Sequence, residues 1–218
     1  RKFIGPSIES ILNQTNQNFE IIIIYDDTDL DDLEHILKIQ KLDERIRIIK
    51  NKKNVGAGYS RNKGILESKG NFIAFLDCDD YWHKDKLKKQ LWFMTENKIS
   101  FSFTSYNIIN SYNDIIKLNK APKKIQFNDL LKDCKIGLST VMLEKKLLDE
   151  YCMFPKLITK EDFVLWLKIS KKIDLFGLDE PLVNWRKLEN SLSSNVFQKL
   201  IDGYRVYNKY MGFNPLKS

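Results

Sequence analysis

The sequence predicts an α/β fold with a doubly wound, mostly parallel sheet that carries helices on both faces. One reason is that strand and helix patterns alternate through the first 100 residues. A second is that the apolar runs 20–25 and 72–76 are continuous, which is typical of strands buried on both faces. A third is that both runs lead into acidic residues, and open α/β sheets bind ligands at the carboxyl ends of their strands.

The elements expected before the second acidic cluster form two strand–helix alternations. Apolar spacing predicts a first helix with Pro6 near its start, where a helix tolerates proline. The alternating strand at 45–50 is expected near a sheet edge. In chain order the expected elements are a helix over 4–14, a strand over 20–25, a helix around 33–37, a strand over 45–50, a loop over 54–58, a helix over 59–67 and a strand over 72–76.

The pattern after Trp82 is less regular, and its strands are shorter and less apolar. The strongest signal is a helix over 161–170, with Phe163, Leu167 and Ser170 on one side. The other expected elements are a helix over 86–97, strands over 101–109 and 115–118, short helices over 127–131 and 145–150 flanking a strand near 139–143, a strand over 182–186 and a final helix over 196–210.

The composition indicates a globular protein. The chain has 218 residues, of which 43% are hydrophobic and 30% charged, and no apolar run approaches the roughly 18–20 residues of a membrane span. Its net charge of +7 comes from scattered lysines that we interpret as solvated helix faces. Because no nucleic-acid-binding motif accompanies them, we expect no nucleic-acid partner. Three dispersed cysteines without metal-ligand spacing argue against structural zinc and for a reducing, cytoplasmic location.

The segment Asp77-Cys-Asp79-Asp80 carries the clearest chemical signal. Residues two apart in an extended chain point to the same side, so Asp77 and Asp79 should lie together at the end of a buried strand. Two such carboxylates repel unless a cation lies between them, and a divalent ion takes one or two carboxylates plus phosphate oxygens of a substrate. The alternative is an acidic cap for the next helix, expected near Lys84, which would explain Asp80.

Two further segments leave alternatives open. In Gly56-Ala-Gly58-Tyr-Ser-Arg61 the last glycine of a dinucleotide fingerprint is absent, so Arg61 either contacts a base, ribose or phosphate, or pairs with a strand-end aspartate. At the start of the helix over 161–170, Asp162 could complete a capping box with Thr159. It could equally be a general base for a hydroxyl acceptor.

Together these motifs resemble the inverting GT-A glycosyltransferases of family 2, of the bacterial surface-polysaccharide type. The similarity extends over most of the chain in the family's order, although the family's usual first strand is lacking. The matching segments are 10–15, 19–27, 54–62 with Gly64, 70–82, 86–90, 161–168 and 190–194.

The resemblance implies a GT-A fold and assigns roles to individual residues. Asp79 would bind a divalent ion, Mn²⁺ or Mg²⁺, as in the family's DxD motif, and Asp77 would approach the ribose or the metal. Asp162 would be the base that deprotonates the acceptor hydroxyl. The remaining substrate-binding residues would be Asp26 at the nucleotide base, Arg61 nearby and Glu161.

The implied activity is a metal-dependent, inverting transfer of a sugar, of the hexosyltransferase type. The donor would be a nucleotide-diphosphate sugar and the acceptor a carbohydrate or lipid-linked glycan in lipopolysaccharide or capsule synthesis. We expect a single domain over 1–218, with a nucleotide-binding half over 1–100 and an acceptor-binding half over 101–218. A cytoplasmic enzyme with a peripheral contact at the inner membrane face would suit such an acceptor. The alternative is a non-catalytic nucleotide-sugar-binding module or an inactive fragment.

Overall fold

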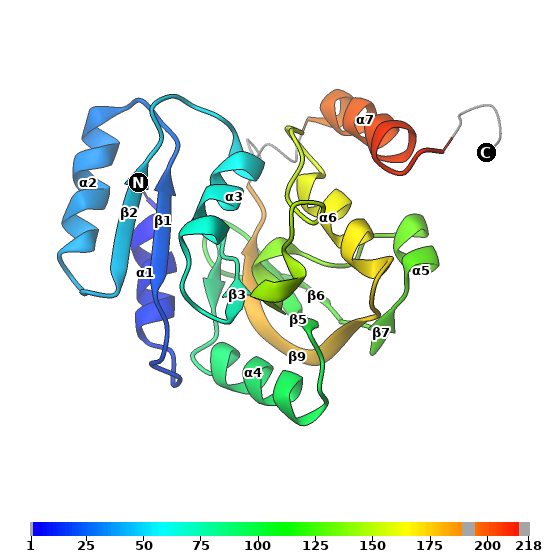
Figure 1. Ribbon diagram of the computed structural model, residues 1–218. Coiled ribbons are helices and arrows are strands. Elements are labelled where there is room, and N and C mark those ends of the chain that lie inside the picture. Colours follow the sequence, from blue (N-terminus) through cyan, green and yellow to red (C-terminus); the bar gives the residue numbers. More distant parts are fainter. Residues whose placement is uncertain (1, 189–194, 214–218) are drawn as a thin grey trace.

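The computed structural model describes residues 2–188 and 195–213. Its helices and strands alternate in the first half of the chain, which confirms the predicted α/β class (Figure 1). The helices are α1 (Ile4–Leu12), α2 (Leu30–Gln40), α3 (Ala57–Glu67), α4 (Lys86–Glu96), α5 (Phe127–Lys132), α6 (Glu161–Ser170) and α7 (Val196–Arg205). The strands are β1 (Ile21–Tyr25), β2 (Ile46–Lys50), β3 (Phe72–Ala74), β4 (Tyr81–Trp82), β5 (Phe101–Ile109), β6 (Ile115–Asn119), β7 (Lys124–Ile125), β8 (Met142–Glu144) and β9 (Leu175–Arg186).

The strands form two sheets. β1 and β2 make a parallel pair, and a seven-stranded sheet has the order β3-β8-β5-β9-β4, with β6 paired to β5 and β7 paired to β9. The expected parallel pairing holds for β1–β2 and for β5–β9, while the other pairs in the seven-stranded sheet are antiparallel. The sequence pattern of the second half therefore predicted fewer antiparallel strand pairs than the structure has. Short strands joined by turns can pair back on one another, which produces antiparallel pairs.

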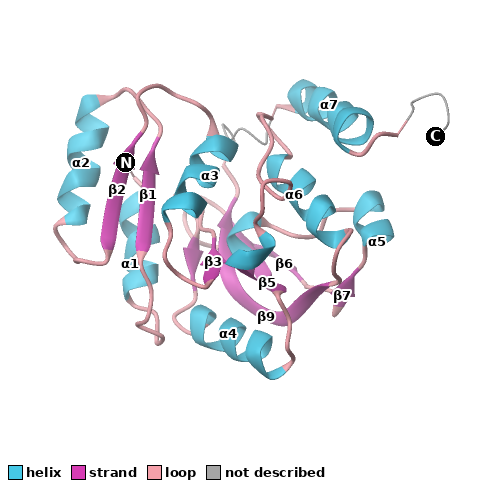
Figure 2. Ribbon diagram, viewed as in Figure 1, coloured by secondary structure: helices cyan, strands magenta, loops and turns pink. Residues whose placement is uncertain are grey.

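One buried apolar cluster packs α1 and α2 against the β1–β2 pair. Ile8 of α1 and Ile39 of α2 pack with Ile21 and Ile46 of the β1–β2 pair, all of them buried. As Figure 2 shows, β1 and β2 point toward the same end of the molecule, so both deliver their carboxyl ends there. The predicted edge position of β2 is confirmed, because it pairs only with β1 among the described strands.

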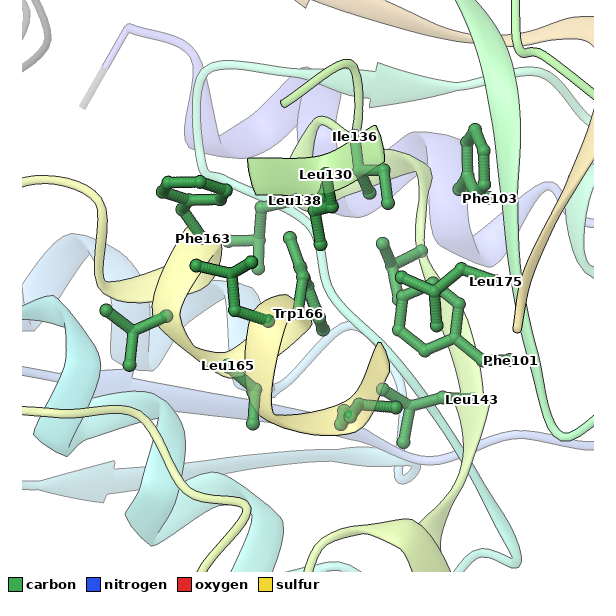
Figure 3. Packing of buried hydrophobic residues seen from close by; sticks show 14 of the residues in the cluster. Phe101, Phe103, Leu130, Ile136, Leu138, Leu143, Phe163, Leu165, Trp166 and Leu175 are labelled. Carbon is green, nitrogen blue, oxygen red and sulfur yellow. The ribbon is translucent and has the colours of Figure 1, made fainter. Parts of the chain in front are cut away.

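Helix α6 lies at the centre of the largest core. Its residues Phe163 to Leu167 are all buried, as expected for a helix that is apolar on every side. The Trp166 ring is fully buried and meets Phe101 of β5 edge-on, with 5.1 Å between ring centroids. Figure 3 shows these side chains packed with Leu143 of β8 and Leu175 of β9. This core fixes the start of α6, where Glu161 and Asp162 lie.

Several predicted boundaries are wrong for identifiable reasons. β9 begins at Leu175 rather than 182, because it continues through Pro181 with a shift in its pairing to β5. Proline lacks the amide hydrogen that a regular ladder needs, so the sequence pattern suggested a strand end there. The strand expected over 139–143 is a 3₁₀ turn followed by β8, and 145–147 form a 3₁₀ turn rather than part of an α-helix. The segment 190–194 lies outside the described residues.

Candidate active site

Three residues from distant parts of the sequence form one ion-pair cluster. Arg61 of α3 donates from Nη2 to Oδ1 of Asp77 at 2.8 Å and from Nη1 to Oε1 of Glu161 at 2.6 Å. Burial alone would lower the pKa of Arg61, but these two carboxylates outweigh it and raise the pKa. The predicted salt bridge between Arg61 and a strand-end aspartate is therefore confirmed. The cluster joins the end of the β3 segment to the start of α6.

The start of α3 lies close to the start of α6 because the residue at the contact, Gly58, has no side chain. A Cβ atom on Gly58 would lie 2.9 Å from the carbonyl oxygen of Pro155 and 3.4 Å from Cγ of Glu161. One turn further along α3, the Asn62 side chain accepts a hydrogen bond from the Phe154 amide and donates one to the Phe154 carbonyl, each at 2.9 Å. These contacts hold Arg61 where it can reach both carboxylates.

Asp26, at the carboxyl end of β1, fixes the loop that leads into α3. Its carboxylate accepts hydrogen bonds from Asn51 at 2.8 Å, from the Val55 amide at 2.9 Å and from the Gly56 amide at 2.8 Å. Burial raises the pKa of Asp26, but these hydrogen bonds outweigh it and the pKa is lowered. The neighbouring Asp27 is exposed. The loop before α3 is thus held by a charged group at the site edge of the β1–β2 pair.

Residues 77–80, here called the acidic loop, carry three carboxylates with different surroundings. Asp80 is buried and accepts hydrogen bonds from the Ser139 hydroxyl at 2.6 Å and the Arg186 amide at 2.9 Å. Burial, and then the charge of Asp77, raises the pKa of Asp80 to about 8. The predicted capping role of Asp80 is wrong, because α4 begins at Lys86 and is preceded by Asp85. Asp80 instead anchors the loop to the interior.

Ser139 and Arg186 support the acidic loop, and Ser139 was not among the predicted site residues. The Ser139 hydroxyl accepts a hydrogen bond from the Asp77 amide at 3.1 Å while donating to Asp80. Arg186 donates from Nε to the Asp79 carbonyl at 3.0 Å, and its Nη1 reaches the Asn110 carbonyl at 2.9 Å. The local sequence around these residues does not predict their contacts with the acidic loop, because each contact joins segments that only the fold brings together.

Asp77 and Asp79 are the residues that could hold a divalent cation. Burial, and then the charge of Asp77, raises the pKa of Asp79, which means that the two carboxylates repel one another. A cation between them would relieve that repulsion, and carboxylate oxygens suit Mg²⁺ or Mn²⁺. Among the described residues, no group of three or more His, Cys, Asp and Glu side chains could hold a metal ion. The two aspartates would therefore share a cation with water or substrate oxygens, an arrangement that Mg²⁺ commonly adopts.

Asp162 is not part of a capping box, so that alternative is wrong. The residue before α6 is Lys160, in a left-handed conformation with φ of 63°, and no side chain caps the helix. The Thr159 hydroxyl donates instead to Asp202 of α7 at 3.1 Å. Burial, and then the charge of Glu161, raises the pKa of Asp162 to about 6, against an opposing effect of Arg61. A carboxylate with this pKa can exchange a proton near neutral pH.

A cavity of about 150 Å³ lies between α1, α2, the end of β1 and the acidic loop. Its lining is mainly apolar and includes Phe3, Tyr25, Ile36 and the exposed Cys78 of the acidic loop. It lies at the carboxyl end of β1, the position at which open α/β sheets take up ligands. A planar, partly apolar ligand group could enter beside Tyr25 and Cys78 of the acidic loop.

Comparison with known proteins agrees with this architecture. The structure of Staphylococcus aureus TarS 1–349 in complex with UDP-GlcNAc superposes with a TM-score of 0.78, at 20% identity over 96% of this chain and 62% of that one. The putative teichuronic acid biosynthesis glycosyltransferase TuaG of Bacillus subtilis is 36% identical over 100% of this chain and 87% of its own length. The Escherichia coli protein WfgD, a UDP-Glc:α-D-GlcNAc-diphosphoundecaprenol β-1,3-glucosyltransferase, is 38% identical over 98% of this chain and 83% of its own.

The fold and these relatives define a glycosyltransferase with the GT-A fold, as the sequence predicted. A family model described as glycosyl transferase family 2 matches residues 1–151. The chain therefore belongs to glycosyl transferase family 2. In the described parts of the chain, no helix has the length and apolar character that crossing a membrane requires.

Proposed function

We propose that this chain transfers a sugar, with inversion, from a uridine-diphosphate sugar to a hydroxyl of a lipid-linked glycan during surface-polysaccharide synthesis. The name of WfgD supports the donor and acceptor classes, since it describes transfer from UDP-Glc to a diphosphoundecaprenol-linked sugar. The TarS complex supports a uridine nucleotide at this fold, because that protein was crystallised with UDP-GlcNAc.

The observation that carries the proposal is the position of Asp162 beside the Arg61 cluster. Its carboxylate, with a pKa of about 6, lies next in sequence to Glu161, which Arg61 connects to Asp77 of the acidic loop. The guanidinium of Arg61 thus connects the acidic loop, where the diphosphate would leave, to the start of α6, where the proposed base Asp162 lies. In a direct displacement Asp162 takes the proton of the acceptor hydroxyl as that oxygen attacks the anomeric carbon. The bond from that carbon to the diphosphate breaks on the opposite face, so the configuration inverts.

The other predicted residues receive supporting roles in this proposal. Asp77 and Asp79 would hold Mg²⁺ or Mn²⁺, which when bound neutralises charge on the departing diphosphate. Arg61 orients Asp77 through the ion pair of 2.8 Å. Asp26 would fix the loop before α3 next to the nucleotide base. Glu161 would contribute to substrate binding by holding Arg61 in place through their ion pair. Residues 1–100 would form the nucleotide-binding half and 101–218 the acceptor-binding half.

A turnover assay on the purified full-length protein tests the proposal. We expect one UDP-sugar from a panel to raise the thermal unfolding midpoint in the presence of Mg²⁺ or Mn²⁺. The same donor should release UDP only when a diphospholipid-linked sugar is supplied, with an inverted linkage in the product. Protection by a UDP-sugar without any transfer, across a panel of lipid-linked acceptors, would favour the non-catalytic binding module instead.

A further inference from the structure

Helix α7 presents an apolar face to solvent. Its apolar residues occur at spacings of one, four, five and eight positions, which places them on one side of a helix. Each of these side chains is at least half exposed. The apolar face of α7 consists of Val196 at 65% exposure, Phe197 at 81%, Leu200 at 67%, Ile201 at 50% and Tyr204 at 60%.

The opposite side of α7, which packs against the protein, is centred on a charged residue. Asp202 is fully buried and accepts hydrogen bonds from the Thr159 amide at 3.0 Å, the Thr159 hydroxyl at 3.1 Å and the Gln198 amide group at 2.9 Å. Arg205 donates to its other oxygen at 3.0 Å. A surface helix normally buries its apolar side, so α7 has the reverse arrangement. Its orientation is fixed by hydrogen bonds that leave the apolar face outward.

The continuation of α7 is also attached to the body of the protein. The Tyr207 hydroxyl donates to the Leu131 carbonyl at 2.8 Å, and the Tyr207 ring meets Phe163 of α6 with 6.4 Å between centroids. Val206, which precedes Tyr207 in the chain, is fully buried. The apolar face is therefore held outward by contacts of Asp202 in the second half of α7 and of Tyr207 just after it.

The exposed charged residues of segment 195–213 are all basic, although Arg205 pairs with the buried Asp202. Residues 195–213 contain Lys199, Arg205 and Lys209 as basic residues, and their one acidic residue, Asp202, is buried and already paired. Lys160, which precedes α6, also lies alongside, with its Cε 3.7 Å from the position of a Cβ on Gly203. Solvent therefore meets an apolar stripe bordered by cations. An apolar stripe with aromatic residues and basic flanks is the composition of helices that lie in the interface of an anionic bilayer.

We propose that the apolar face of α7 inserts into the surface of an anionic lipid bilayer and docks the protein there. The ten residues of α7 are too few to span a bilayer, so the helix would lie parallel to the membrane plane. Lys199, Arg205 and Lys209 would remain at the level of the lipid phosphates.

The position of α7 connects this surface to the active site. The Thr159–Asp202 hydrogen bonds attach α7 to a residue that lies three positions before Asp162. Figure 2 shows α7 at the end of the molecule toward which β1 and β2 point. A docked α7 would hold the proposed base near the lipid surface, where a lipid-linked acceptor has its sugar. This inference thus deepens the proposed function and rests on it for its biological purpose, although lipid binding can be measured separately.

Vesicle co-sedimentation tests the inference. We expect the full-length protein to sediment with vesicles of phosphatidylcholine containing about 30 mol% phosphatidylglycerol, and much less with phosphatidylcholine alone. The double variant Phe197→Ser with Leu200→Ser should bind the anionic vesicles at least about tenfold more weakly, because two large apolar side chains no longer enter the bilayer. The matched control, Ile115→Ser with Ile116→Ser, removes two exposed apolar residues of β6 and should bind like the wild type.

Further readouts separate this inference from the others. The α7 double variant should keep the wild-type unfolding midpoint and the wild-type protection by a UDP-sugar, so a loss of vesicle binding would be specific. Equal sedimentation of the wild type and the α7 variant would overturn the inference. It would also be overturned if the α7 substitutions lowered the unfolding midpoint, which indicates packing against this chain, or converted a dimer to a monomer, which indicates self-association. An absence of transfer activity with vesicle binding intact would count against the proposed function alone.

Discussion

The acidic loop and the start of α6 both place carboxylates next to Arg61, yet the two regions differ in what surrounds the second carboxylate. In each region one carboxylate, Asp77 or Glu161, forms an ion pair with Arg61. In the acidic loop, burial and then the charge of Asp77 raise the pKa of Asp79, with Arg186 acting against them. The remaining Asp162 is brought to a pKa of about 6 by burial and Glu161, with Arg61 acting against them. The loop thus favours the binding of a cation, whereas the helix start favours the exchange of a proton.

The largest expected effect is on the helix side of this comparison. Asp162→Asn keeps the size of the side chain but removes the proton acceptor, so kcat at pH 8 should fall by about 10²–10⁴-fold. Binding of the UDP-sugar should stay near the wild-type value, because the proposed donor site lies at the acidic loop. The measurement is steady-state transfer together with donor titration by calorimetry. Near-normal turnover would show that Asp162 is not the base.

The next effect concerns the acidic loop. Asp79→Asn keeps the shape of the side chain but removes one of two carboxylates at the proposed cation site, and should lower kcat/KM by roughly 100-fold at a fixed metal concentration. Part of that loss should be recovered at higher Mn²⁺ concentration. A titration of activity against Mn²⁺ gives the result, and an unchanged metal dependence would remove Asp79 from the site.

A third effect tests the arginine that the two regions share. Arg61→Met leaves Asp77 and Glu161 without their common partner and should lower the free energy of unfolding by roughly 2–4 kcal/mol. This is less than for a fully buried pair, because the Asp77 side chain is 37% exposed and partly solvated. Arg47→Met is the matched control, since Arg47 pairs with Glu67 across a more exposed surface and its loss should cost less than about 1 kcal/mol. Urea unfolding compares them, and equal costs would contradict the role given to Arg61.

The smallest effect at about pH 4 concerns Asp80, which anchors the loop without taking part in either role. Because its pKa is raised to about 8, the native protein holds a proton there that the unfolded chain releases above its ordinary pKa near 4. Wild-type stability should therefore decline as the pH rises from about 4 to 8, whereas Asp80→Asn lacks this decline. At about pH 4, close to the ordinary pKa, the two proteins should differ by less than about 1 kcal/mol in EDTA, and the difference should widen as the pH rises toward 8. Parallel stability profiles across that range would show that Asp80 is ionised in the native protein.

Local pattern was enough to predict the elements that carry the site. The continuous apolar runs placed β1 and β3 correctly in order, and the apolar helix over 161–170 is α6. The pairing of Arg61 with a strand-end aspartate was among the predicted alternatives, and the structure shows that pair. Charge and strand order therefore carry much of the information about this part of the site.

The parts that sequence could not supply depend on contacts between distant segments. Ser139 lies in a 3₁₀ turn and reaches Asp80 only because β8 pairs with β3. Arg186 reaches the acidic loop because β9 runs beside β4. The capping-box pattern at Thr159 was misleading, because its hydroxyl bonds to Asp202 of a later helix rather than to α6. In each case a tertiary partner replaced the local one that the pattern suggested.

The dependence of kcat on pH tests the role of Asp162 most directly. Because its carboxylate must be ionised to accept a proton, the wild-type rate should rise with pH up to an apparent pKa near 6 and then level off. The low residual rate of Asp162→Asn should show no such rise between pH 5 and pH 8, roughly the span of the titration. A wild-type rate that does not vary over this range, or an Asp162→Asn variant with the same pH profile as the wild type, would contradict the assignment of the base.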